Sequence, residues 1–180
     1  MLANVLNEGE QAIMQSNQPQ LLDRLRAAFP ATSIQSEGAF DDWGVTYLDA
    51  EPYMARIDGK TWQELDRAYV VMRSDALSFL GTRHLVAVLP VYLTSLIEEG
   101  VWSPAADTLM LLLAKPGPEK KTGLKLARFE ALVAALMPAQ QAVIAAVLSA
   151  FAASDPGGSL GRAARAAVES YWQNCLSNGS

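Results

Sequence analysis

The sequence predicts an all-α protein, and three observations support this fold class. Apolar residues make up 51% of the 180 residues and aromatic residues only 8%, and alanine and leucine, which are strong helix formers, dominate the apolar set. Apolar residues recur at helical spacing in several segments. A strand is indicated at most for residues 45–48. A chain of this length can bury a core without disulfides or metals, so we expect one compact multi-helix domain over residues 1–180.

The N-terminal third is predicted to contain one helix and a long irregular segment. Residues 1–17 are interpreted as an N-terminal arm. A modest amphipathic helix follows from Pro19 to Phe29, and Pro30 ends it. Residues 31–59 are rich in Gly, Pro, Asp and aromatic residues, which predicts an irregular loop region.

Thr61 and Glu64 have the spacing of a capping box, which predicts the start of a helix that carries Trp62, Leu65 and Tyr69. A short helical turn over residues 75–80 is expected to end at Gly81. The next segment, Thr82 to Glu98, is apolar nearly all round and is therefore predicted to be the central helix. Pro90 removes one backbone hydrogen bond inside it and predicts a kink.

The C-terminal half predicts four further helices. Ser103 and Pro104 form a typical helix start that leads into residues 108–114. A solvated connector over 115–123 precedes helices over 124–136, 138–153 and 160–176. Residues 131–154 carry no charge and approach the length of a membrane span. Pro138 divides them, so we predict two buried helices and no membrane association.

Composition limits the classes of partner. The formal net charge of −5 lacks the basic character that phosphate binding requires, so nucleic acid is excluded as an expected partner and a basic protein is favoured. Cys175 is the single cysteine and there is no signal-peptide pattern, which favours the cytoplasm. The acidic positions have no calcium-loop spacing and no cofactor motif is present, so no metal or cofactor is expected.

Two groups of acidic and aromatic residues are candidates for contacting a partner. Asp41, Asp42 and Trp43 lie together in the irregular segment. Glu98 and Glu99 lie at the end of the central helix, where they oppose the negative end of the helix dipole. Aromatic residues interleaved with acids can form a protein-binding surface, although folding of the irregular segment onto the helical core would use the same aromatic residues.

His84 and Tyr92 are the candidates for catalysis. Both fall in the central helix, two turns apart, and a His–Tyr pair facing one cleft could transfer a proton. A single histidine among apolar residues is more often structural. The sequence therefore favours a non-catalytic interaction protein of the accessory or immunity type, with a small enzyme built around His84 and Tyr92 as the alternative.

Several short motifs together resemble a group of bacterial proteins of unknown function, the DUF6714-like family. The resemblance covers roughly residues 55 to 173, and its motifs are Trp62-x-x-Leu65, Leu77-Ser78-Phe79, Leu89-Pro90-Val91-Tyr92-Leu93, Pro138-Ala139-Gln140-Gln141-Ala142-Val143 and Glu169-Ser170-Tyr171-Trp172. The chain departs from the pattern at Val86-Ala87-Val88 and at Met137. The resemblance implies a helical single domain and indicates no activity.

Overall fold

The computed structural model describes residues 8–35, 37–40, 49–117 and 123–176, and these residues form an all-α fold without strands. The α-helices are α1 (Glu8–Ala28), α2 (Ala50–Ile57), α3 (Arg67–Met72), α4 (Thr82–Glu99), α5 (Ala106–Leu113), α6 (Gly123–Ala135), α7 (Pro138–Ser154), α8 (Ser159–Ala167) and α9 (Gln173–Leu176). Short 3-10 turns are η1 (Trp62–Glu64), η2 (Ser74–Ser78) and η3 (Gly100–Trp102), and η4 (Val168–Trp172) is a π-helical turn.

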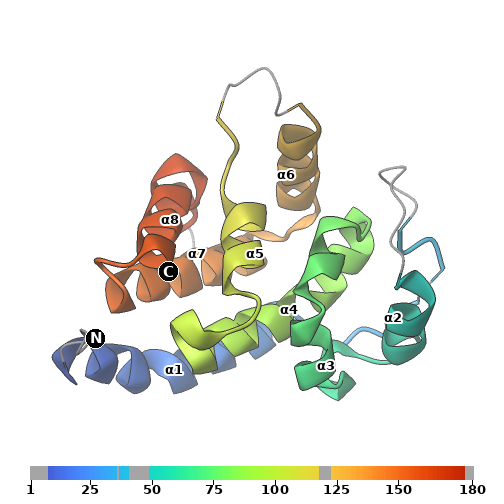
Figure 1. Cartoon of the computed structure of the whole chain (residues 1–180), viewed down its shortest axis with the longest axis horizontal. Coiled ribbons are helices and arrows are strands. Elements are labelled where there is room, and N and C mark those ends of the chain that lie inside the picture. Colours follow the sequence, from blue (N-terminus) through green and yellow to red (C-terminus); the bar gives the residue numbers. More distant parts are fainter. Residues whose placement is uncertain (1–7, 36, 41–48, 118–122, 177–180) are drawn as a thin grey trace, which may run out of the picture.

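Two helices, α4 and α7, organise the packing. The α7 helix packs against α1, α4, α8 and α9, while α4 packs against α1, α3 and α6. Figure 1 shows α1 along one side of the molecule, with α8 at one end and α2 and α3 at the other. Apolar side chains from all these helices form one continuous core, in which Trp172, Tyr53, Tyr92 and Phe151 are the largest fully buried side chains.

The predicted central helix is confirmed. The α4 helix extends from Thr82 to Glu99, and most of its side chains are buried. It ends at Gly100, whose φ of 58° lies in the left-handed region that glycine adopts at little cost. Pro90 lies buried inside the helix, and a kink at this residue stays a prediction.

The uncharged stretch over residues 131–154 is two helices, as predicted. The chain bends by 119° between α6 and α7. At the break, the Gln140 side-chain oxygen accepts a hydrogen bond from the Met137 N–H at 2.9 Å, and the Gln141 side chain donates to the Val133 and Leu136 carbonyls. Across the described residues, one continuous helical stretch, Thr82–Trp102, has the length and hydropathy of a membrane span. Of the 18-residue part that has this hydropathy, 56% is buried inside the protein.

The structure corrects the N-terminal part of the prediction. Helix α1 begins at Glu8, so residues 8–17 belong to it and not to an arm, and Pro19 lies inside it. Helix α2 falls within the segment 31–59 that was predicted to be irregular. Its Pro52 occupies the first turn, where a backbone N–H has no partner within the helix, and Tyr53 and Ile57 are buried four residues apart.

Two predicted helices are also interrupted. The helix expected from Thr61 onward is divided into η1 and α3, because Leu65 is extended and Asp66 starts a new helix by accepting a hydrogen bond from the Tyr69 N–H. The final helix contains the π-helical turn η4 between α8 and α9. This wider turn includes Trp172, which is fully buried and donates its indole N–H to the Leu113 carbonyl at 2.7 Å.

Candidate functional site

A short extended segment, residues 29–35, crosses the surface between α1 and α2, and we call it the strap. The carbonyl of its first residue, Phe29, accepts a hydrogen bond from Trp62 Nε1 at 2.8 Å. In its middle, Ile34 N donates to the Lys60 carbonyl and Gly59 N donates to the Ile34 carbonyl, both at 2.8 Å. The φ of Gly59 is 71°, which favours glycine at this close approach.

The far end of the strap is held by His84. Its Nε2 lies 2.7 Å from the Gln35 carbonyl oxygen. A carbonyl only accepts, so Nε2 carries the hydrogen and Nδ1 is the acceptor in the neutral ring. His84 is only 5% exposed. The histidine therefore has a structural partner, which is the ordinary role of a single histidine among apolar residues.

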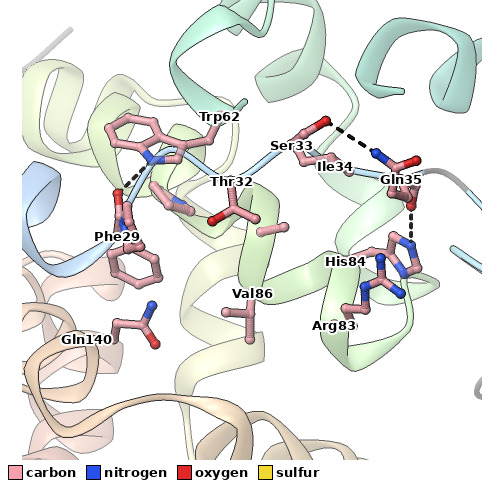
Figure 2. Close-up of a pocket in the computed structure, with 13 residues that line it drawn as sticks. Phe29, Thr32, Ser33, Ile34, Gln35, Trp62, Arg83, His84, Val86 and Gln140 are labelled. Carbon is pink, nitrogen blue, oxygen red and sulfur yellow. Dashed lines mark hydrogen bonds between the residues drawn. The ribbon is translucent and has the colours of Figure 1, made fainter. Parts of the chain in front are cut away.

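A cavity of about 230 Å³ lies between the strap and α4 (Figure 2). Its apolar wall comes from both sides: Phe29, Pro30 and Ile34 from the strap, and Val86, Ala87 and Pro90 from α4. Trp62 closes one side of the cavity. Polar groups on the wall come from Thr32, Ser33, Gln35, Arg83, His84 and Gln140. The strap thus forms one wall of a small, mainly apolar cavity.

Gln140 is the contribution of α7 to this cavity. It is 8% exposed, and its oxygen accepts the hydrogen bond from the Met137 N–H. Within the described residues, its Nε2 donates to no other group. Figure 2 shows Gln140 at one end of the cavity, with Arg83 and His84 at the other end and Val86 between them. In the sequence, Gln140 stands out only as part of a motif, because nothing in its local pattern indicates that α7 faces the strap.

A second cavity, of about 430 Å³, is also lined by Trp62. Its wall includes Leu22 of α1, Leu65, and the ion pair between Arg67 and Glu98. Trp62 therefore lines two cavities while its indole N–H holds the strap.

The structure does not bring His84 and Tyr92 together. Eight residues advance a helix by two turns and a further rotation of about 80°, so the two side chains leave α4 in different directions. Tyr92 is fully buried, and its hydroxyl lies 3.2 Å from the Tyr53 hydroxyl and 3.4 Å from the Arg73 carbonyl. It does not line the cavity that contains His84. The pair gives no support to the enzyme alternative.

Cys175 lies apart from both. Its thiol is 3.5 Å from the Gln141 side-chain oxygen, and burial raises the pKa of the thiol above its ordinary value. A raised pKa keeps the thiolate fraction low at neutral pH, so the thiol is a weak nucleophile.

Of the candidates for partner contact, Asp41, Asp42 and Trp43 lie outside the described residues. Glu98 and Glu99 are both exposed at the end of α4, and Glu98 pairs with Arg67. The structure adds a residue that sequence analysis missed: Trp102, in the turn that follows these acids, is 84% exposed. The position of Trp102 after Gly100, outside the apolar pattern of α4, was the signal that could have indicated its exposure.

These features define a helical protein with a strap-covered cavity and an exposed acidic end of its central helix. The model of the DUF6714 family, a family of unknown function, matches residues 17–176. The chain therefore belongs to this family. The match begins within α1, well before the region over which the sequence motifs suggested the resemblance. Comparison with curated proteins and with solved structures gives no match.

Proposed function

We propose that this protein is a non-catalytic interaction protein that binds a basic protein partner through the exposed end of α4. The observation that carries the proposal is Trp102, a large aromatic side chain that is 84% exposed and lies three residues after the acidic pair Glu98 and Glu99. Tryptophan is one of the residue types most enriched among those that dominate binding energy at protein interfaces.

The neighbouring segment extends the same character. On α5, Asp107 and Leu111 lie one turn apart and are both exposed, with Leu111 at 80%. We call Glu98, Glu99, Trp102, Asp107 and Leu111 the acidic–apolar surface. These residues come from three consecutive elements, and η3, which carries Trp102, packs against both α4 and α5.

The chemistry of this surface selects a partner class. Two apolar side chains supply area that gains free energy when it is removed from water. The three surrounding acids attract Lys and Arg side chains and repel acidic proteins, in keeping with a net charge of −5. A basic, amphipathic segment of a second protein matches both features. One acid, Glu98, is already paired with Arg67, so Glu99 and Asp107 are the acids expected to contribute most.

The test is affinity capture from a lysate of the native host, followed by titration of the captured partner against purified variants. Trp102→Ala is expected to weaken binding by at least tenfold, because hot-spot truncations cost about 2 kcal/mol or more. Glu99→Lys is expected to slow association and to reduce its dependence on salt.

Two matched controls come from α6. Leu124→Ala removes another exposed apolar side chain, and Glu130→Lys makes the same charge change at another exposed position. Both are expected to bind like the wild type. The proposal would be contradicted if Trp102→Ala left binding unchanged. It would also be contradicted if Glu130→Lys weakened binding as much as Glu99→Lys.

A further inference from the structure

The cavity beneath the strap has polar groups whose hydrogen-bonding capacity the protein itself leaves unused. The Gln140 amide is the clearest case. Its side chain is more than nine-tenths buried and its oxygen is occupied by the Met137 N–H, but its Nε2 has two hydrogens and no acceptor among the described residues. Buried polar groups without a partner lose the hydrogen bonds that water would give them, which costs free energy. An acceptor placed in the cavity would remove this cost.

Arg83 supplies a positive charge at the opposite end. It lines the cavity, is exposed, and makes no ion pair with any described residue. Its place in the first turn of α4 is unfavourable for a cation, because the helix dipole is positive there. Arg83 therefore does not stabilise its own helix. A negative group in front of the guanidinium would interact favourably with both the side chain and the helix end.

Between these two polar ends the wall is mainly apolar, although Thr32 also lies there (Figure 2). Val86, Ala87 and Pro90 line the cavity from α4 and form its floor, and Phe29, Pro30 and Ile34 line it from the strap. This region favours carbon and disfavours a string of ordered waters, which need two to four polar partners each. The volume of about 230 Å³ lies below the range of about 300–1,000 Å³ that holds a drug-sized ligand, so the occupant is small.

We propose that this cavity binds a small carboxylic acid that carries a second hydrogen-bond acceptor at its far end. The carboxylate pairs with Arg83, the carbon chain lies on the α4 floor, and the second acceptor receives a hydrogen bond from Gln140 Nε2. His84 does not bind the ligand through Nε2, which is occupied by Gln35, but positions the strap over it. This site is independent of the acidic–apolar surface, so either proposal can fail without the other.

A titration with 5-oxohexanoate, a carboxylate with a distant ketone, tests this assignment. Two-dimensional ¹H–¹⁵N NMR follows the side-chain amide of Gln140 and the indole N–H of Trp62 directly. Both resonances are expected to shift in a saturable way. Hexanoate, which lacks the ketone, and 5-oxohexanamide, which lacks the charge, are each expected to bind about tenfold more weakly, as the loss of one charged or buried hydrogen bond implies.

The variants separate the two ends. Arg83→Gln is expected to reduce the affinity for 5-oxohexanoate about tenfold while leaving that for 5-oxohexanamide unchanged, and Arg24→Gln, which makes the same charge change on α1, is expected to leave both unchanged. Gln140→Glu keeps the oxygen that caps Met137 and replaces the donor, so it is expected to reduce the affinity for 5-oxohexanoate at least tenfold in a folded protein.

Three results would overturn the proposal. The first is no saturable shift with 5-oxohexanoate in the wild type. The second is equal affinity for the amide and the acid, which would show that the cavity does not select a negative charge. The third is an unchanged affinity in Arg83→Gln and in Gln140→Glu, which would place binding elsewhere.

Discussion

The two sides of this molecule are held together by different interactions. Around α7, contact is made by apolar side chains that are almost completely buried, including Ile144, Leu148 and Phe151. Around the strap, the buried side chains of Phe29 and Ile34 are joined by individual hydrogen bonds from side chains to backbone, chiefly those of Trp62 and His84, and two cavities lie beside them. Around most of α7 the contacts are apolar and closely packed, whereas the strap lies beside cavities that have room for a ligand.

Truncating Trp172 is expected to have the largest effect on stability, because it creates a cavity in the closely packed side. The ring is fully buried, makes edge contacts with Phe129 and Tyr171, and donates its N–H to Leu113. Trp172→Ala is predicted to lower the free energy of unfolding by about 4–5 kcal/mol, measured by denaturant titration. Trp172→Phe keeps most of the packing and is expected to cost clearly less.

The same truncation on the strap side sharpens the comparison. Trp62 is 9% exposed and already borders two cavities, so its removal takes away fewer contacts. Trp62→Ala is predicted to cost about 3 kcal/mol in the same titration, less than Trp172→Ala. If Trp62→Ala proves the more damaging of the two, the strap side is not the more loosely packed side, and the comparison fails.

Arg128 tests whether hydrogen bonds to backbone carry comparable weight elsewhere. From α6, its guanidinium donates to the carbonyls of Leu77, Ser78 and Leu80 at the end of η2, and burial lowers its pKa from the ordinary value. Arg128→Met is predicted to cost about 2 kcal/mol, because carbonyls lose charged donors while the aliphatic stem is retained. Lys125→Met, at an exposed position on α6, is the control and is expected to change stability by less than about 0.5 kcal/mol.

The contrast between the two sides also explains what the sequence could predict. Helices α4, α6 and α7 follow from apolar periodicity and from Pro138, because burial on a helical face leaves a repeating pattern. The hydrogen bonds of Arg128 and His84 join residues about fifty positions apart, and no local pattern encodes such a pair. Helix α2 was missed because Pro52 and its acidic neighbour suggest a loop, although Tyr53 and Ile57 have helical spacing.

The candidate site was predictable only in part, for the same reason. His84 was identified as unusual from its type and position, and it does line the cavity. The predicted pairing of His84 with Tyr92 was wrong. The two residues were expected on one face of the helix, but a separation of eight residues rotates the Tyr92 side chain away from that of His84. Gln140 joins Arg83 and His84 only through the packing of α7 and the strap onto α4, which depends on the whole fold.

The smallest expected effect is a dependence of stability on pH at the start of η1. The Glu64 carboxylate accepts hydrogen bonds from the Thr61 N–H and hydroxyl, both at 2.8 Å. The backbone hydrogen bond and then the hydroxyl lower the pKa of Glu64 below its ordinary value. A group whose pKa is lowered by folding stabilises the folded state above its unfolded pKa, and this contribution is lost as the pH falls through the lowered pKa.

Wild-type protein is therefore expected to be slightly more stable than Glu64→Gln at neutral pH, and the difference is expected to shrink as the pH falls below the ordinary Glu value of about 4.3. Denaturant titrations of the two proteins across this range measure the difference directly. The two hydrogen bonds join Thr61 and Glu64, which flank Trp62. Glu64→Gln is therefore expected to loosen the strap side and to leave the α7 side unaffected. Hydrogen exchange that becomes faster at Ile34 and Gly59, with α7 amides unchanged, is the expected pattern, whereas equal acceleration on both sides would show that the two sides unfold as one unit.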